Sequence, residues 1–196
     1  MSAPSRVLRE PIDALRMLQP GPLALLTTRF RSADNVMTAG WMMPISMHPP
    51  LIAVAVHPGR LTHMHITRSE YFALNIPTAE LLNAVHTCGI ISGRDEDKFT
   101  RAGLTPTDAI QLELPLIEEC VAHIECGLVQ RASIGDHDLF IGRPLAVSAI
   151  DTAFNGRWMI NVDEGQILHH LRADAYASLS RSYRGQLIGD DEDERG

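Results

Sequence analysis

The segment Pro58–His63 places a turn, a guanidinium group and a hydroxyl group at the start of a helical pattern. Thr62 is the predicted N-cap, so unpaired backbone N–H groups would lie close to its hydroxyl and to the guanidinium of Arg60. Helix-start N–H groups and an arginine side chain are suitable donors for a phosphate. The segment therefore predicts an anion site, and the alternative is an ordinary helix start that binds only water.

A second stretch, residues 35–51, contains small and hydroxyl-bearing residues where a barrel wall could carry bulky ones. Small residues let a flat ligand approach the backbone, whose N–H and C=O groups can then bind its polar edge. The residues concerned are Thr38, Ala39, Gly40 and Ser46. The alternative is a kinked strand with a β-bulge, and composition alone favours that alternative.

A third stretch, residues 88–99, contains Lys98, which is the only lysine among 17 basic residues. A lysine in a chain that otherwise uses arginine indicates a requirement for an ammonium group rather than a guanidinium group. Arg94 precedes it by four residues, and both lie among acidic residues. This pattern is also typical of an ordinary surface helix.

The three cysteines, Cys88, Cys120 and Cys126, are odd in number and form no C-x-x-C pair. Without a signal peptide, they are expected to be reduced core thiols of a cytoplasmic protein. His63 and His65 lie two residues apart, with no cysteine or carboxylate cluster nearby, so we predict no metal site.

The length of 196 residues suits one domain. The chain has 17 Lys and Arg against 24 Asp and Glu, a net charge of −7, and five of the acids lie between residues 190 and 194. We therefore predict one domain over residues 1–189, with a nearly neutral surface, and an acidic tail over 190–196. The absence of a basic, aromatic stripe argues against nucleic acid, and the absence of a long apolar run argues against a membrane span.

Hydrophobic patterning predicts more strands than helices, and the strands do not alternate regularly with helices. The predicted strands are 23–28, 36–41, 51–56, 71–76, 120–131 and 139–150, with a polar turn over 29–35. The predicted helices follow Pro11, span 61–69, run from Thr78 to Cys88, and span 95–102 before Gly103. This pattern disfavours a doubly wound parallel sheet and favours an antiparallel barrel decorated by helices.

In this order, the segments resemble the flavin reductase-like family of FMN-binding split barrels, and most closely its flavoredoxin-type branch. The resemblance extends from about Gly21 to Ile150. It is carried by Pro22-Leu23-Ala24-Leu25-Leu26-Thr27-Thr28, Asn35-Val36-Met37-Thr38-Ala39, Ser46-x-x-Pro49-Pro50, Phe72-Ala73-Leu74-Asn75-Ile76-Pro77, Ser92-Gly93-Arg94-Asp95, Asp97-Lys98-Phe99 and Gly135-Asp136-His137. It implies a mainly β fold with helical inserts, a split β-barrel that is antiparallel and of Greek-key type.

The resemblance implies a homodimer that holds FMN, or in some members FAD, near the subunit interface. It implies that Thr38, Ala39, Gly40, Trp41 and Ser46 line the isoalloxazine ring and the ribityl chain. By the same resemblance Arg60 and Thr62 would hold the phosphate. The remaining residues that would close around the flavin or its phosphate are Asn75, Ser92, Arg94 and Lys98.

The resemblance also implies a redox activity in which NAD(P)H passes a hydride to the flavin and the protein supplies orientation. His137 matches a histidine that lies near the nicotinamide in several reductases, although a hairpin histidine is often only solvent-exposed. The electrons would pass to a partner monooxygenase or to an acceptor such as ferric iron. No dinucleotide fingerprint selects NADH over NADPH.

Two other functions stay open from the sequence. One is an FMN-containing electron carrier that a protein donor reduces, and the other is a split barrel that binds a ligand without redox chemistry. The region after Ile150 fits the family less well. Trp158, Tyr176 and Tyr183 in that region are expected in core packing or a dimer contact, or alternatively in a lid over the flavin.

Overall fold

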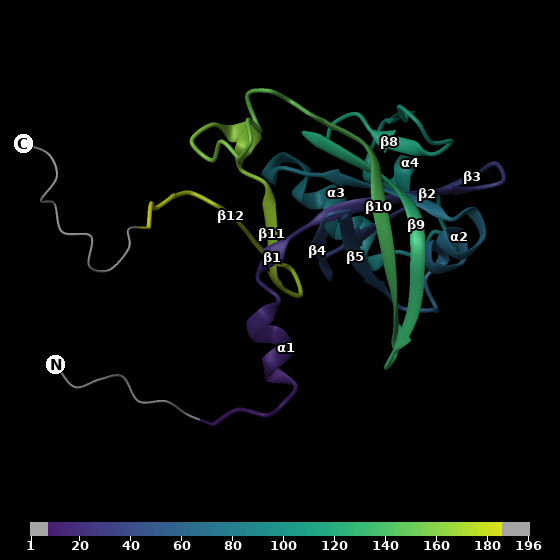
Figure 1. The fold of residues 1–196 in the computed structure, drawn as a ribbon, viewed down its shortest axis with the longest axis horizontal. Coiled ribbons are helices and arrows are strands. Elements are labelled where there is room, and N and C mark those ends of the chain that lie inside the picture. Colours follow the sequence, from purple (N-terminus) through teal and green to yellow (C-terminus); the bar gives the residue numbers. More distant parts are fainter. Residues whose placement is uncertain (1–7, 186–196) are drawn as a thin grey trace, which may run out of the picture.

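Seven antiparallel strands form the main sheet in the computed structural model, which describes residues 8–185 (Figure 1). They are β2 (Ala24–Phe30), β3 (Ala33–Ala39), β4 (Met42–Met47), β5 (Pro50–Val56), β6 (Tyr71–Ile76), β9 (Ala122–Ile134) and β10 (His137–Ala149). Their order is β3-β2-β6-β9-β10-β5-β4, so the two edge strands are consecutive in the chain and only Gly40 and Trp41 connect them. The predicted antiparallel split barrel with helical inserts is confirmed.

Short helices lie on the outside of this barrel (Figure 1). They are α1 (Asp13–Leu18), α2 (Leu61–Ser69), α3 (Leu82–Ile90) and α4 (Lys98–Ala102). Helix α2 packs on β2 and β3, and α3 packs on β3 and α4. The bounds predicted for α2 and for β6 are confirmed.

Strand β2 shows how one segment contributes to two layers of the core. Ala24 and Leu26 pack inside the barrel with Phe72 and Phe140. Leu25 packs outward with residues of α3 and α4. Successive side chains of a strand point to opposite faces, so an apolar strand covered on both faces reads as a continuous apolar run.

The N-caps differ from those predicted, although the start of α2 does not. Arg60, rather than Thr62, is the N-cap of α2, and Thr62 lies inside that helix. Thr78 is the N-cap of a 3₁₀ turn, η1 (Ala79–Leu81), that precedes α3, and its side chain makes no capping hydrogen bond. Helix α3 also continues beyond Cys88 to its end at Ile90.

The fourth predicted helix, over 95–102, begins three residues later. The Asp97 side chain accepts a hydrogen bond from the N–H of Phe99 at 3.0 Å, so α4 starts at Lys98. Its predicted end before Gly103 is confirmed. A capping carboxylate satisfies one of the unpaired N–H groups of the first turn, which fixes the start.

The strand predictions miss two features. The polar turn predicted over 29–35 contains only Arg31 and Ser32, because Arg29 and Asp34 form a cross-strand ion pair within the β2–β3 hairpin. The predicted strand 36–41 ends at Ala39, and β4 then forms an edge strand with a bulge between Pro44 and Ser46. A proline lacks an N–H group and is tolerated at an edge strand. The backbone therefore matches the kinked-strand alternative for residues 35–51.

Two smaller sheets flank the barrel. One contains β1 (Gly21–Pro22), β11 (Leu168–Arg172) and β12 (Ala175–Ser178), and the other contains β7 (Pro106–Asp108) and β8 (Pro115–Ile117). The pairing of β1 with β11 places a segment near the start of the chain beside one near its end (Figure 1). Before β11, the 3₁₀ turn η2 (Asp163–Gly165) needs glycine, because a Cβ on Gly165 would lie 2.1 Å from the Met159 carbonyl oxygen.

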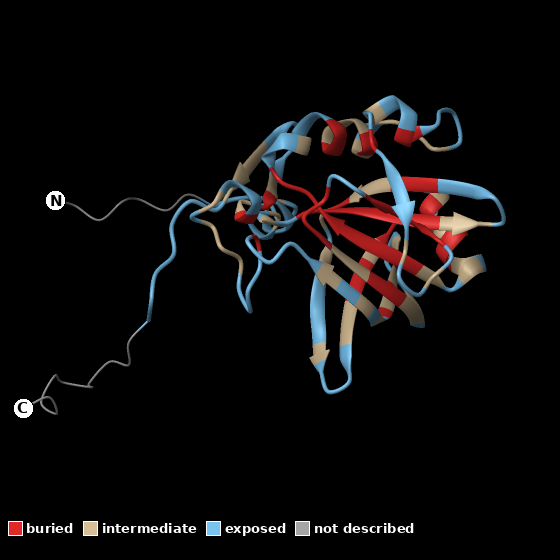
Figure 2. Cartoon of the chain, turned by 90° about the horizontal axis from the view of Figure 1, so that it is seen from above, coloured by how far each residue is buried: buried red, intermediate tan, exposed pale blue. Residues whose placement is uncertain are grey.

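Figure 2 shows buried residues in the barrel strands and on the helices beside them, whereas the chain after β12 is exposed. All three cysteines are free and buried, as expected for core thiols. Burial raises the pKa of Cys88 to about 11 and that of Cys126 to about 12. The acidic tail predicted for 190–196 lies outside the described residues, and one domain over 1–189 stays a prediction.

Candidate functional site

A cavity of about 740 Å³ opens where β3 meets the starts of α2 and β10. Its volume lies in the range of about 300–1,000 Å³ that is usual for small-molecule sites. The residues from the sequence-based prediction that line it are Thr38, Ala39, Gly40, Trp41, Arg60 and His137. The structure therefore brings together side chains from three of the predicted segments.

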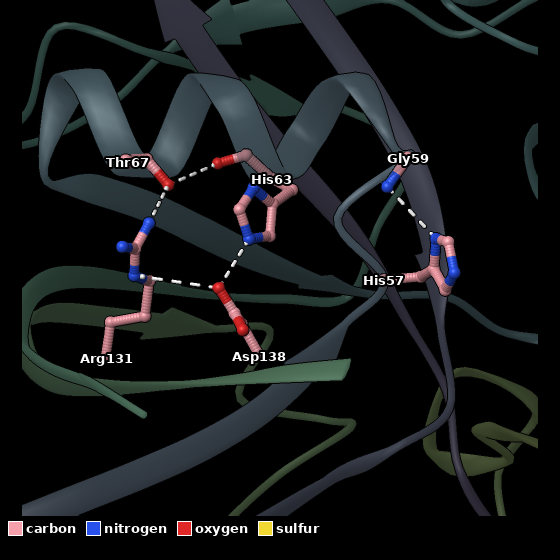
Figure 3. A network of polar contacts seen from close by, with 6 residues as sticks. All are labelled: His57, Gly59, His63, Thr67, Arg131 and Asp138. Atoms are coloured by element: carbon pink, nitrogen blue, oxygen red, sulfur yellow. Dashed lines mark hydrogen bonds and ion pairs between the residues drawn. The ribbon is translucent and has the colours of Figure 1, made fainter. Parts of the chain in front are cut away.

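One side of this cavity, the barrel wall, consists of Trp41, His57 and His137. The ring of His137 lies 4.9 Å from that of Trp41 and 5.3 Å from that of His57, measured between centroids. The Gly59 N–H donates to Nδ1 of His57 at 3.0 Å, which fixes that ring beside the turn (Figure 3). The barrel wall thus presents flat ring surfaces to a ligand.

The barrel wall is tied to helix α2 by a polar network (Figure 3). Asp138 Oδ2 lies 2.7 Å from Nε2 of His63 and 3.6 Å from Nε of Arg131. The hydrogen bond with His63 holds the pKa of the Asp138 carboxyl below its usual range, with Ser133 contributing. Because Asp138 follows His137 and His63 follows Arg60 by three residues, the network fixes two sides of the cavity relative to each other.

One end of the cavity carries positive charge. Arg60 lines the cavity and is exposed, and within residues 8–185 its guanidinium has no hydrogen bond or ion pair. Lys98 does not line this cavity: it is only 6% exposed, and its Nζ donates to the Cys88 carbonyl oxygen at 2.8 Å. Burial lowers the pKa of Lys98, and the nearby charge of Arg60 lowers it further. Two cations close to each other favour an anionic ligand.

The other predicted residues have their polar atoms placed elsewhere. The Thr62 hydroxyl accepts a hydrogen bond from Asn35 at 2.7 Å, and Thr62 is buried. Asn75 is fully buried in β6, where its amide bonds Leu25 and Ile117 of neighbouring segments. Neither residue lines the cavity, so a direct contact with a ligand stays a prediction for both.

Three further predicted residues also lie off the cavity. Ser46 is in β4 opposite Leu51, beyond the bulge. The Ser92 hydroxyl accepts from the N–H of Arg94 at 3.1 Å. Arg94 lines a separate hollow of about 450 Å³ that also contains Lys98. Their roles toward a ligand stay predictions.

A second group of lining residues, the hairpin wall, consists of Gln19, His86, His170 and Tyr176. The side chain of Gln19 lies 2.9 Å from Nδ1 of His170, and the Tyr176 hydroxyl lies 3.1 Å from Nδ1 of His86. The sequence predicted Tyr176 in core packing or a dimer contact, with a lid over the flavin as the alternative. It gave no signal for His86, because the partner of that residue lies 90 positions away.

Among the described residues, no helix is long and apolar enough to cross a membrane. The same residues contain no group of three or more His, Cys, Asp or Glu side chains that could hold a metal ion.

Comparison with known proteins gives the family. Residues 17–170 match the family model described as flavin reductase like domain. A protein from Archaeoglobus fulgidus, named only as uncharacterized, is 36% identical over 152 residues, which are 78% of this chain and 85% of that protein.

Solved structures agree with this match. An FMN-binding protein from Thermus thermophilus has a TM-score of 0.81 at 24% identity, over 93% of this chain and 100% of that chain. The flavoredoxin of Desulfovibrio vulgaris (Miyazaki F) has a TM-score of 0.75 at 25% identity, over 97% and 98% of the two chains. The family model covers most of the sequence, and the chain therefore belongs to the flavin reductase-like family.

Proposed function

We propose that the protein binds FMN, or alternatively FAD, in the cavity and is an oxidoreductase that takes a hydride from NAD(P)H. The observation that carries this proposal is the combination, in one cavity, of the ring-lined barrel wall with the guanidinium of Arg60, which has no partner within residues 8–185. A flavin mononucleotide has both a planar ring system and a phosphate, so it matches both features. Membership in the flavin reductase-like family supports the same cofactor.

The residues present fit this cofactor. Thr38, Ala39 and Gly40 offer backbone groups at the end of β3, next to the indole of Trp41. Arg60 would bind the phosphate, with the backbone N–H groups at the start of α2 and the hydroxyl of Thr62 as further donors.

When bound, the flavin supplies the hydride chemistry. The protein's residues would bind the flavin and the nicotinamide and orient them toward each other. Trp41 and His137 would restrict the planar ligands to one stacking geometry, and the ammonium of Lys98 would stabilise negative charge near the phosphate end. This function needs no nucleophilic side chain.

A second function is supported by the structural similarity to a flavoredoxin. In that case the protein keeps FMN bound and a protein donor reduces it. In either case, the electrons would pass to a protein partner such as a monooxygenase or to a small acceptor, in the cytoplasm. A split barrel without redox activity is the third alternative.

We also propose that two copies form a homodimer through an apolar face. Met43, Val147 and Phe154 are 57%, 65% and 39% exposed, and they line an apolar hollow of about 340 Å³ beside Trp158. Exposed apolar patches of this kind mark interfaces. Light scattering should give the mass of two chains for the wild type and of one chain for Val147→Glu. A wild-type mass of one chain would contradict the dimer.

The visible spectrum separates the three functions. A flavin spectrum that bleaches when NADH or NADPH is added without oxygen supports the reductase. A flavin spectrum that bleaches only with dithionite or a protein donor supports the electron carrier. A colourless protein that takes up no FMN contradicts both.

The placement of the phosphate has its own test. The double variant Arg60→Ala, Thr62→Val should bind FMN roughly 10- to 100-fold more weakly, because charge-assisted hydrogen bonds to the phosphate are lost. Arg68→Ala, at the other end of α2, is the matched control and should leave the affinity unchanged. Equal FMN affinity in wild type and double variant would show that the phosphate lies elsewhere.

A further inference from the structure

The hairpin wall is not used by the proposed flavin site. Its residues come from three separate parts of the chain: the segment after α1, helix α3, and the β11–β12 hairpin. They face the same cavity as the barrel wall. The hairpin is held in place by the pairing of β1 with β11 and by the bond from the Leu23 N–H to the Leu168 carbonyl at 3.1 Å.

The hydrogen bonds of His170 determine which of its ring nitrogens carries the hydrogen. Its Nε2 lies 3.1 Å from the Ala173 carbonyl oxygen, which only accepts, so Nε2 carries the hydrogen. Its Nδ1 accepts from the amide of Gln19. Both ring nitrogens of His170 therefore have a hydrogen-bond partner, and the ring lies 5.2 Å from that of Tyr176. His170 therefore provides a surface rather than a free polar atom.

Tyr176 provides the free polar atom of this wall. Burial, with a smaller contribution from Asp174, raises the pKa of its phenol, so the hydroxyl keeps its hydrogen at neutral pH. The phenol oxygen is 3.1 Å from Nδ1 of His86. When Nδ1 of His86 carries a hydrogen and donates it to that oxygen, the O–H of Tyr176 is available to a ligand in the cavity.

The ligand class follows from these surroundings. The wall consists of aromatic and imidazole rings with neutral donors, and the cavity floor beside it contains Leu23 and Met37. An anion would instead be drawn to Arg60 at the other end. A neutral, planar molecule with a carbonyl oxygen matches this wall: its plane fits the rings and the apolar residues, and its oxygen can accept from the phenol of Tyr176.

We propose that the hairpin wall binds a quinone as electron acceptor, with Tyr176 hydrogen-bonded to a quinone oxygen. This inference rests on the proposed function for its source of electrons. Reduction of a quinone to a hydroquinone consumes one hydride and one proton. The hydride comes from the NAD(P)H-reduced site. Tyr176 gives its phenol proton to one quinone oxygen, Nδ1 of His86 returns a proton to Tyr176, and Nε2 of the partly exposed His86 takes up a proton from water. His86 is a positioning residue that acts through Tyr176.

The test compares Tyr176→Phe with Tyr183→Phe, a matched change at a tyrosine that is 81% exposed and lies off the cavity. Calorimetry with 2-methyl-1,4-naphthoquinone should show about tenfold weaker binding for Tyr176→Phe and no change for Tyr183→Phe. Steady-state reduction of the same quinone should fall at least tenfold in Tyr176→Phe, whereas reduction of ferricyanide, which takes up no proton, and FMN affinity should stay within twofold of wild type. His86→Gln should lower quinone turnover and leave quinone binding nearly unchanged.

Unchanged quinone binding in Tyr176→Phe overturns the proposal, and so does an equal loss of quinone and ferricyanide reduction, because that would place the effect on the flavin site or on folding. The calorimetric arm needs no turnover. If neither nicotinamide reduces the protein, the proposed function fails, while the quinone-binding comparison still decides whether the hairpin wall is a quinone site.

Discussion

The two walls of the cavity are built in different ways. The barrel wall lies at the ends of main-sheet strands: Trp41 is between β3 and β4, His57 follows β5, and His137 begins β10. The pairing of Asp138 with Val56 brings His137 next to His57. The hairpin wall lies on short strands outside the barrel, and side-chain contacts between residues as far apart as Gln19 and His170 assemble it. A change in the main-sheet strands that support the barrel wall should therefore affect folding. A change in the hairpin wall should affect mainly what the cavity binds.

The largest expected effect is on the strands that support the barrel wall. Asn75→Leu should lower the free energy of unfolding by about 3 kcal/mol, because the buried Leu25 carbonyl, Thr27 hydroxyl and Ile117 N–H all lose a partner. Urea unfolding measures this change.

The matched change in the hairpin wall is Gln19→Leu, which removes one half-buried hydrogen bond to His170 and should cost less than about 1 kcal/mol. Equal losses in both variants would remove the proposed difference between the walls. If Asn75 contacts the flavin, as the sequence resemblance implies, the folded Asn75→Leu protein would also bind FMN more weakly.

These residues also show what a sequence can predict. The bounds of helix α2 and strand β6 were predicted correctly, because Pro58-Gly59 precedes the helix and Pro77 ends the apolar run of the strand. Strand β4 was missed because Pro44 and the bulge after it hide the alternation. Strand β11 was missed because its inner positions hold histidines rather than apolar residues.

The same contrast applies to the site. Trp41, Arg60 and His137 were predicted because they lie in segments whose order resembles a known family, and the fold brings them to one cavity. The pair of His86 and Tyr176 could not be predicted, because its meaning depends on a contact between α3 and β12 that no local pattern encodes.

A smaller effect is expected at the network that ties the barrel wall to α2. The folded protein lowers the pKa of Asp138, chiefly through the hydrogen bond with His63. The carboxylate therefore stabilises the fold at pH values above the ordinary aspartate pKa of about 4, and this contribution is lost as the pH falls through the lowered pKa. Asp138→Asn should be less stable than wild type at pH 7, and the difference should shrink as the pH falls below about 4.

Urea unfolding at pH 7, 5 and 3 measures this convergence. Asp136→Asn is the matched control: its carboxylate also faces a histidine, His137, but it is 85% exposed and solvent screens it. A stability difference for Asp138→Asn that is the same at all three pH values would show that packing, rather than charge, ties the hairpin to α2.

The smallest expected effect compares the two hairpin turns beside the walls. Gly135, in the β9–β10 turn next to His137, has a φ of 62°, and Ala173, in the β11–β12 turn, has a φ of 50°. Left-handed backbone costs a non-glycine residue about 1 kcal/mol, and glycine costs about 0.5–1 kcal/mol of extra unfolded-state entropy. The two contributions oppose each other at both positions, so Gly135→Ala should destabilise the protein by at most about 0.5 kcal/mol, and Ala173→Gly should change its stability by less than about 0.5 kcal/mol. Thermal unfolding checks both, and quinone binding should survive Ala173→Gly because the carbonyl that orients His170 is kept. Weaker quinone binding in that variant would show that the hairpin wall depends on the stiffness of its turn as well as on its side-chain contacts.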